Sequence, residues 1–287
     1  MEIFFRQELL EYAEPGHPES PARLIAIVKN LQQRGRKLLS FEPASTEQLL
    51  AVHSSRLVES VRSNTFFDPD CPNIPFIFRY ASLAAGGAIK AATLALSGTD
   101  GCALIRPPGH HAGKNFLGGF CYFNNLAIAV AHVLQQGKRV AILDIDGHHG
   151  NGTEDIFRDQ PQVAFASLHE AGAYPFTGVE NFGNCRNYPL ASGISPTKYL
   201  EVLDEALEFL SHFSPDILAV SLGFDTHAQD PLLHFTLRES DFFRMGSMIR
   251  SSLKSPAFLV FEGGYNAERT GRSFICFLDG WERVNQD

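Results

Sequence analysis

Five short segments of this chain consist almost entirely of apolar residues and end in glycine-rich or polar turns. They are CALIRPPG (102–109), RVAILDIDG (139–147), VAFASLHE (163–170), DILAVSLGFD (216–225) and AFLVFEGGY (257–265). The apolar residues run continuously instead of alternating, which is typical of strands buried on both faces of a parallel sheet. Because such a sheet needs helices on both faces, this feature restricts the chain to an α/β fold.

Segments with the three-to-four-residue apolar spacing of amphipathic helices lie between these strands. The expected helices are 21–35, 77–97, 126–137 and 195–213, the last with Ser195 as its N-cap and Pro196 in its first turn. No repeat, linker or charge block divides the chain. The pattern therefore predicts a single α/β domain over residues 1–287, with a mostly parallel central sheet flanked by helices on both faces.

Charge and composition exclude several classes of partner. The formal charge of −8 argues against a surface that binds nucleic acid. No apolar run approaches the roughly 18 residues of a membrane span, and the first residues lack the pattern of a signal peptide. The five cysteines are widely spaced without a C-x-x-C pair, as in proteins that keep reduced thiols. We therefore expect a cytoplasmic protein that binds neither nucleic acid nor membranes.

Side chains that can bind a metal ion or transfer a proton stand at the ends of four of the five apolar segments. They are His110 and His111, then Asp144, Asp146 and His148, then Asp225, and finally Tyr265. Open α/β sheets bind ligands beyond the carboxyl ends of their strands, so these side chains are expected to share one site.

A metal ion accounts for three of these residues. Asp146 and His148 are two positions apart and project to the same side of an extended segment, so both can reach one ion. Asp225 is the best candidate for a third ligand. Two carboxylates and an imidazole suit a divalent ion such as Zn²⁺ and leave a position open for water or substrate.

The remaining residues suit proton transfer beside such an ion. An imidazole of the His110–His111 pair can act as general base, while Asp144 and Asn151 can fix the histidine tautomers. The two glycines before Tyr265 allow a tight turn that aims the phenol inward, where it can donate to a developing oxyanion.

These motifs together resemble the zinc-dependent histone deacetylase family, on the arginase/deacetylase fold, and most closely its class II and prokaryotic members. The resemblance spans nearly the whole chain, and its motifs are HPESPARL, LLAVHSSRLVESV, RPPGHHA, GFCYFNNLAIA, DIDGHHGNGTEDIF, SLH, GFDTHAQDPL and EGGYN.

The resemblance implies a role for each matching residue. One Zn²⁺ would be held by Asp146, His148 and Asp225. His111 would be the general base and acid, His110 its electrostatic partner and Tyr265 the phenol that polarises the acetyl carbonyl. Asp144 would hold His110, and Asn151 would hold His111 less strongly as an imidazolium than the aspartate of class I members does.

The resemblance also implies a substrate tunnel and a second ion. Gly119, Phe120 and Tyr174 would line the tunnel, and Asp70 would grip the substrate at its rim. The residues expected to hold a K⁺ ion near the zinc are Asp144, Asp146, His148, Ser167 and Leu168.

The implied reaction is hydrolysis of the acetamide of an N-acetylated amine to acetate and free amine. Acetyl-lysine and acetylpolyamines share this head group. Leu232 stands where polyamine-selective relatives often have a glutamate, which argues against that gate. Glu14, Glu19 and Glu170, in contrast, are expected to approach the mouth and favour a cationic tail.

Two other functions compete with this interpretation. A dimanganese ureohydrolase has the same fold, but His227 follows Asp225 where it needs a further ligand, and it has no use for the histidine pair or Tyr265. A catalytically silent module that binds acetylated ligands would be expected to lack one of the catalytic residues. His149 projects opposite to His148 and has no role in any of these schemes.

Overall fold

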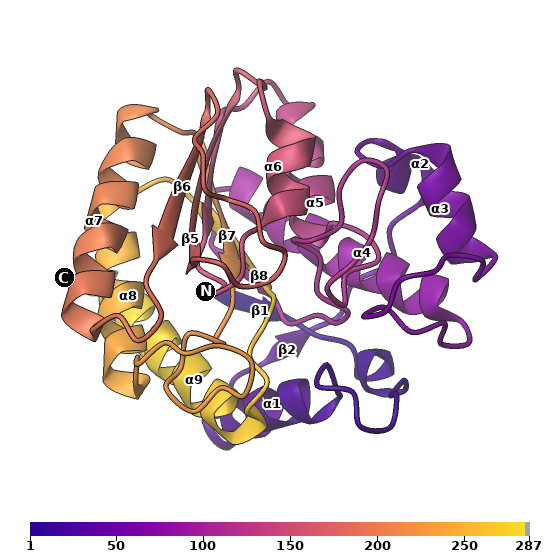
Figure 1. Cartoon of the computed structure of the whole chain (residues 1–287), viewed down its shortest axis with the longest axis horizontal. Helices are drawn as coiled ribbons and strands as arrows, with labels where there is room; N and C mark the ends of the chain where they lie inside the picture. Colours follow the sequence, from indigo (N-terminus) through magenta and orange to yellow (C-terminus); the bar gives the residue numbers. More distant parts are fainter. Residues whose placement is uncertain (285–287) are drawn as a thin grey trace.

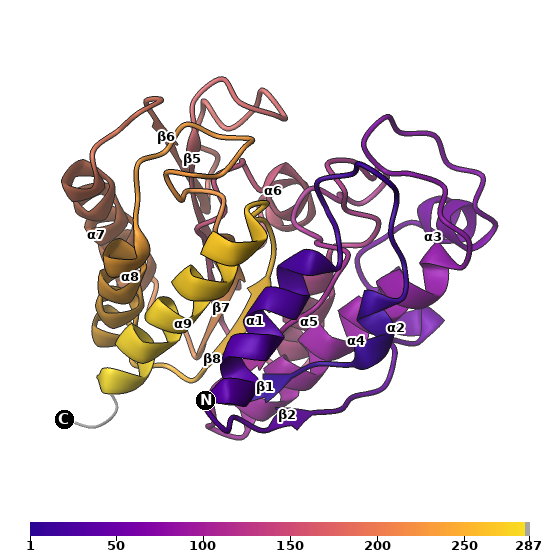
Figure 2. The same ribbon diagram turned by 90° about the horizontal axis from the view of Figure 1, so that it is seen from below.

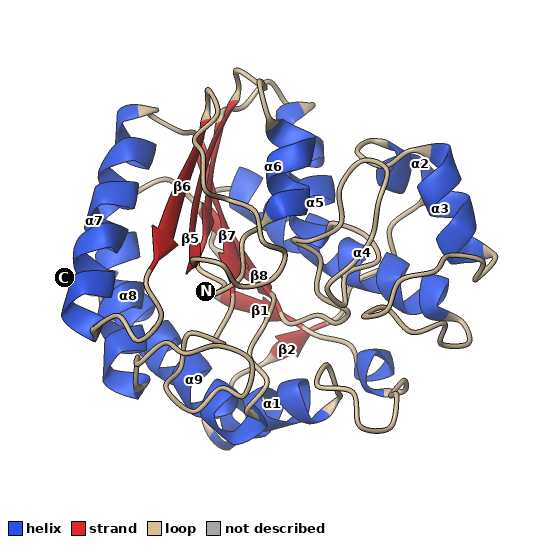
Figure 3. Ribbon diagram, viewed as in Figure 1, coloured by secondary structure: helices blue, strands red, loops and turns tan. Residues whose placement is uncertain are grey.

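The computed structural model describes residues 1–284 and is built on one eight-stranded sheet, shown in red in Figure 3. All neighbouring strands are parallel, in the order β2-β1-β3-β8-β7-β4-β5-β6. The strands are β1 Glu2–Phe4, β2 Leu38–Leu39, β3 Gly101–Ala103, β4 Val140–Asp144, β5 Val163–Glu170, β6 Cys185–Leu190, β7 Ile217–Leu222 and β8 Ala257–Phe261. The parallel α/β fold expected from the sequence is confirmed.

The five apolar segments all contribute strands, and β3, β4, β5, β7 and β8 are buried along their whole length. One prediction was too long, because β3 ends at Ala103 and residues 104–109 continue as a buried loop. Strands β1, β2 and β6 were not predicted from the sequence. The first two have three and two residues, and β6 is an edge strand in which buried and exposed residues mix.

Helices cover both faces of the sheet, as Figures 1 and 2 show. On one face α7 packs against β4, β5 and β6, and α8, α9 and α1 continue the layer. On the other face α4, α5 and α6 pack against the strands, with α2 and α3 outside them. The helices are α1 Ala22–Gln33, α2 Thr46–Leu50, α3 Ser55–Arg62, α4 Ile77–Leu96, α5 Asn125–Leu134, α6 Asn151–Phe157, α7 Pro196–His212, α8 Glu239–Ser252 and α9 Ala267–Arg283, with a 3-10 turn at Gln7–Leu10.

Local signals explain where two of the expected helices begin. The Ser195 hydroxyl accepts the backbone N–H of Lys198 at 3.3 Å, and Pro196 occupies the first turn of α7. The Asn124 side chain caps α5 by accepting the N–H of Ala127 at 2.9 Å.

Within residues 1–284, no helix has the length and apolarity that crossing a bilayer requires. All five cysteines are free thiols.

The parallel arrangement decides where the site lies. Strands β3, β8, β7 and β4 are neighbours at the centre of the sheet, and their carboxyl ends point the same way. The loops that follow them therefore meet at one edge and carry the histidine pair, Tyr265, Asp225 and the Asp146–His148 segment.

Candidate active site

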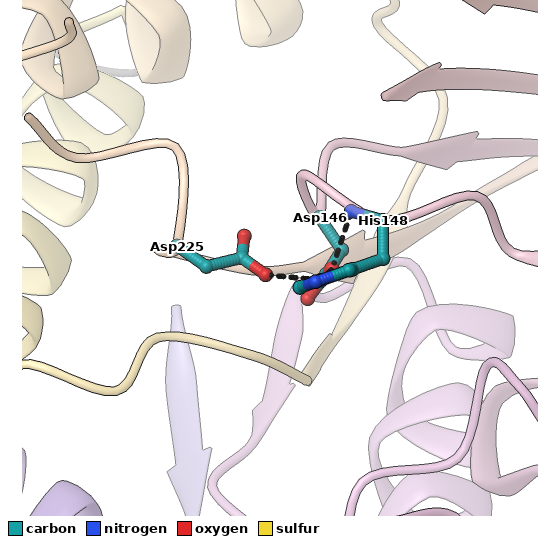
Figure 4. A group of neighbouring side chains, drawn as sticks. All are labelled: Asp146, His148 and Asp225. Carbon is teal, nitrogen blue, oxygen red and sulfur yellow. Dashed lines mark hydrogen bonds and ion pairs between the residues drawn. The ribbon is translucent and has the colours of Figure 1, made fainter. Parts of the chain in front are cut away.

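Asp146, His148 and Asp225 come together at this edge of the sheet (Figure 4). The His148 Nδ1 atom lies 2.8 Å from Asp225 Oδ2 and 3.2 Å from Asp146 Oδ1. One potential ligand atom of each residue lies within 4.8 Å of the others, and all three residues are buried. They form the one group of this kind among residues 1–284.

Backbone N–H groups fix the two carboxylates. Gly147 donates to Asp225 Oδ1 and Gly263 donates to Asp146 Oδ2, each at 2.7 Å. The approach at Gly263 requires glycine, because a Cβ there would lie 2.4 Å from the Asp146 carboxylate. Three strand-end loops thus hold the carboxylates before any ion binds.

The electrostatics of this group favour a cation. Burial and the neighbouring Asp146 raise the pKa of Asp225 to about 7. Burial opposes ionisation of Asp146 too, but His110 and His148 hold its pKa well below the usual range. Although burial lowers the pKa of His148, its bonds to both carboxylates raise it to about 10. The two buried carboxylates are therefore stabilised by a nearby positive charge. A divalent ion bound by them and the imidazole would supply this charge and leave coordination positions open.

The histidine pair stands beside this group on the loop after β3. The two rings lie 4.0 Å apart, and the centroid of the His111 ring is 5.9 Å from that of His148. His110 Nδ1 lies 3.1 Å from Asp144 Oδ2, whereas His111 Nδ1 lies 2.8 Å from Asn151 Oδ1. One histidine thus has a charged partner and the other a neutral one.

This difference separates the proton affinities of the two histidines. Burial disfavours charge on both, but Asp146 and Asp144 raise the pKa of His110 to about 10. Burial and the charges of His110 and His148 lower the pKa of His111 well below its usual value. Because the Asn151 oxygen accepts from Nδ1, the Nε2 atom of neutral His111 keeps a free lone pair and can accept a proton.

Tyr265 follows β8 and is held by two residues that the sequence did not reveal. Its backbone N–H donates to Asp230 Oδ2 at 2.7 Å. The Arg23 guanidinium lies 4.8 Å from the centroid of the Tyr265 ring and donates to the carbonyl of Gly264 at 2.7 Å. Burial raises the pKa of the phenol well above its usual value, so Tyr265 is a neutral hydrogen-bond donor.

Glu262 is a third residue that sequence reasoning missed. Its Oε2 atom accepts the N–H of Gly109 at 2.7 Å and that of His110 at 3.2 Å. The side chain is fully buried, and burial raises its pKa to about 7. The only feature of the sequence that could have indicated its role is its position at the end of an apolar strand, two residues before Gly264.

A pocket of about 370 Å³ opens above these groups. It is lined by Asp70, His111, Gly119, Phe120, His148, Glu170, Ala171, Gly172, Ala173, Tyr174, Leu232, Leu233, His234 and Tyr265. Gly119, Phe120 and Tyr174, which were expected to form the tunnel, therefore line this pocket. Leu232 and Asp70 line it as well. The aromatic rings meet edge to face, with Tyr174 5.0 Å from His111 and Phe120 5.5 Å from Tyr265.

Of the three glutamates expected near the mouth, only Glu170 lines the pocket. The prediction for Glu19 was wrong: it is buried, and its carboxylate accepts from Arg106 at 2.8 Å and from Arg23 at 3.1 Å. Glu14 is exposed and does not line the pocket. Glu170 accepts from the backbone N–H of His234 at 2.8 Å and lies 2.9 Å from its imidazole.

The residues expected to hold K⁺ lie beside the metal group. Asp144 on β4 is paired in register with Ser167 on β5, and Leu168 follows it. Ser167 Oγ lies 3.0 Å from His169 Nδ1, so its hydroxyl can donate there and keep lone pairs for an ion. The K⁺ site stays a prediction.

Two further histidines lie outside the metal group. The side chain of His227 is directed to Glu239 at 3.6 Å, so it does not supply the extra ligand that a second ion would need. His149 is bonded to Glu154 and Thr177, on the other side of its loop from His148.

Comparisons with known proteins agree with this geometry. The family model of the histone deacetylase domain, which describes the sequences of that family, matches residues 17–280 of this chain. A probable deacetylase of Archaeoglobus fulgidus is 37% identical over 294 residues, which cover 93% of this chain and 81% of the relative. Acetylpolyamine amidohydrolase 2 of Pseudomonas aeruginosa is 40% identical, with 76% of this chain and 71% of the relative covered.

Two solved structures are similar over almost the whole chain. The acetylpolyamine aminohydrolase of Burkholderia pseudomallei superposes with a TM-score of 0.93 at 28% identity and covers 99% of both chains. The HD domain of HDA15 has a TM-score of 0.92 at 31% identity and covers 99% of this chain and 89% of its own.

Proposed function

This chain belongs to the histone deacetylase domain family, and on that premise we propose that it hydrolyses the acetamide of an N-acetylated amine with one zinc ion. The family makes it an amidohydrolase; the ion, the residue roles and the substrate are the proposal. The observation that carries it is the buried Asp146–His148–Asp225 group beneath a pocket that also contains His111 and Tyr265.

The donor set suits zinc. Nδ1 of His148 and the two carboxylates would hold the ion, and a bound zinc ion supplies a Lewis acid that makes water acidic enough to attack at neutral pH. Asp144, Ser167 and Leu168, with Asp146 and His148, would hold K⁺.

Two side chains of the pocket would carry out the proton transfers. Nε2 of neutral His111 accepts a proton from the attacking water, and the Tyr265 phenol donates a hydrogen bond to the acetamide oxygen. The water oxygen forms a bond to the carbonyl carbon, and the C–N bond then breaks. His111 returns its proton to the leaving nitrogen, so the products are acetate and a free amine.

The two members of the histidine pair would have different tasks. His111, with its lowered pKa, is free to accept a proton at neutral pH. His110, paired with Asp144, keeps positive charge beside the reacting water and stabilises negative charge on the oxyanion. Glu262 would fix the backbone of this pair through the N–H groups of Gly109 and His110.

The charges that line the pocket favour a substrate amine with a positively charged tail. Among its lining residues are the carboxylates of Asp70 and Glu170, and none is lysine or arginine. Relatives at 37–40% identity include proteins described as acetylpolyamine amidohydrolase and as probable deacetylase. We propose acetylpolyamines and acetyl-lysine as the substrate class.

A panel of acetylated substrates tests the proposal. The rate of acetate release should be measured for N-acetylputrescine, N-acetylspermidine and an acetyl-lysine peptide, and urea release for arginine and agmatine. Acetate from at least one acetylated amine, with no urea, is the expected result. Urea release without acetate would contradict it and favour a ureohydrolase.

A further inference from the structure

One wall of the pocket is a loop whose position is not fixed by packing alone. The wall loop, residues 171–182, lies between β5 and β6 and places the Tyr174 ring beside His111. Phe176 and Val179 on this loop are both 76% exposed. A second cavity of about 440 Å³ is lined in part by Thr177, Gly178 and Val179. Residues 171–174 of the loop thus line the first cavity, and residues 177–180 and 182 line the second.

Two buried imidazoles bind the middle of the wall loop. Thr177 Oγ1 lies 2.8 Å from His149 Nδ1, and the Gly178 carbonyl lies 3.1 Å from His169 Nε2. Among the described residues, the one other hydrogen bond from positions 173–179 to the rest of the chain is that of the Ala173 N–H to the Glu170 carbonyl, at 3.3 Å. The ends of the loop are tied separately, by Ala171 to Leu190 and by Asn187 to Glu180.

The fit around the two imidazoles is tight. Their rings lie 4.7 Å apart. Gly178 has a φ of +80°, and a Cβ there would lie 2.4 Å from His169 Nε2 and 2.7 Å from His149 Cγ. The loop backbone thus reaches the histidines only because residue 178 is glycine.

The partners of each imidazole determine which nitrogen carries hydrogen. Glu154 Oε2 lies 2.9 Å from His149 Nε2 and can only accept, so Nε2 carries the hydrogen. Nδ1 of His149 is then left for the Thr177 hydroxyl, which completes the hydrogen bond at 2.8 Å. In the same way, His169 donates from Nε2 to the Gly178 carbonyl and accepts from Ser167 at Nδ1. Every polar group in this contact therefore has a matching partner.

We propose that Thr177 and His149 are positioning residues that hold Tyr174 against His111 and so set the width of the acyl pocket. This inference rests on the proposed function, because it assumes that the acetylated amine occupies this pocket. It also gives His149 a role: it turns away from the metal because it holds the wall loop.

The Thr177→Val variant removes the hydroxyl and keeps the shape of the side chain. In the zinc-loaded, full-length protein, KM for N-acetylputrescine should rise about three- to tenfold, the effect of one lost hydrogen bond, while kcat changes less than twofold. Thr177→Ser keeps the hydroxyl and should restore the wild-type KM. Val179→Ala, an exposed neighbour on the same loop, is the matched control and should leave KM unchanged.

A double-mutant cycle tests whether Thr177 acts through Tyr174. In a Tyr174→Ala background, Thr177→Val should have almost no further effect on KM. Backbone amide exchange of residues 173–179 should be faster in Thr177→Val than in the wild-type protein and in Thr177→Ser.

Two outcomes would overturn the inference. One is a Thr177→Val protein with wild-type KM and wild-type amide exchange. The other is an equal effect of Thr177→Val with and without the Tyr174 ring. Failure of the proposed function is distinct, since the wild-type protein would then release no acetate, and amide exchange would still decide whether Thr177 holds the loop.

Discussion

The floor and the mouth of the pocket are built in different ways. At the floor, Asp146, His148 and Asp225 are buried and follow the central strands β4 and β7, and the two carboxylates accept backbone N–H groups of neighbouring loops. At the mouth, Leu232 is 38% exposed, and the side chain of His234 is 74% exposed. In the proposed function, the floor would hold the metal ion, and the mouth would select the amine that reaches it.

The largest expected effect is at the floor. Asp225→Ala removes one carboxylate of the metal group, so zinc content should fall from about one ion per chain to near zero and acetate release to background. Elemental analysis and an acetate assay check this result. Asp70→Asn, at the mouth, is the matched control and should keep its zinc. Full zinc occupancy in Asp225→Ala would contradict the assignment.

Tyr265→Phe should have the next largest effect. It removes one hydrogen-bond donor to the acetamide oxygen, and losing such a donor lowers kcat by about 10²- to 10³-fold. Zinc content should not change, because Tyr265 is outside the metal group. A kcat within threefold of the wild-type value would remove the phenol from the mechanism.

A buried histidine on the loop between α2 and α3 makes the free energy of unfolding depend on pH. His53 lies 2.8 Å from the Gly113 carbonyl and accepts the N–H of Asn124 at 2.9 Å, so the fold needs its neutral form. Burial lowers its pKa to about 4. Between pH 6.5 and 4 the unfolded chain binds the additional proton, so stability is lost as pH falls through this window, by up to roughly 3 kcal/mol.

Denaturant unfolding at pH 7 and pH 4.5 measures this contribution. His53→Gln keeps an amide donor and acceptor but does not titrate, so the wild-type protein should lose more stability than the variant between these two pH values. Equal losses in the two proteins would show that His53 does not contribute.

The smallest expected effect is at the mouth. Glu170→Gln removes a charge at constant size, so KM for N-acetylputrescine should rise about two- to fivefold. N-butylacetamide has no ammonium group, and its KM should not change. Equal changes for both substrates would indicate that Glu170 acts through the shape of the loop and not through its charge.

The sequence predicted the floor better than the mouth for a physical reason. Continuous apolar runs located β4, β5, β7 and β8, and parallel strands bring the residues that follow them to one edge. This is why Asp146, His148 and Asp225 could be grouped without coordinates. Loops carry no such periodic signal, and Glu19 was misplaced because nothing in its surroundings showed that it would pair with Arg23 and Arg106.

The residues that support the floor were also missed. Asp230 and Glu262 bind backbone N–H groups of Tyr265, Gly109 and His110. A sequence does not show which backbone groups will meet a carboxylate, because that depends on how two distant loops cross. The sequence does not indicate a role for His149 either, because its partner Thr177 lies 28 positions away on the wall loop.

The central claim is that one zinc ion at the floor enables acetamide hydrolysis, and a metal titration tests it most directly. Protein freed of metal by chelation should be titrated with Zn²⁺ while acetate release from N-acetylputrescine is recorded. Activity should be absent at the start, rise in proportion to added zinc and stop rising at one ion per chain. Full activity without metal, or a rise that continues to two ions per chain, would contradict this account.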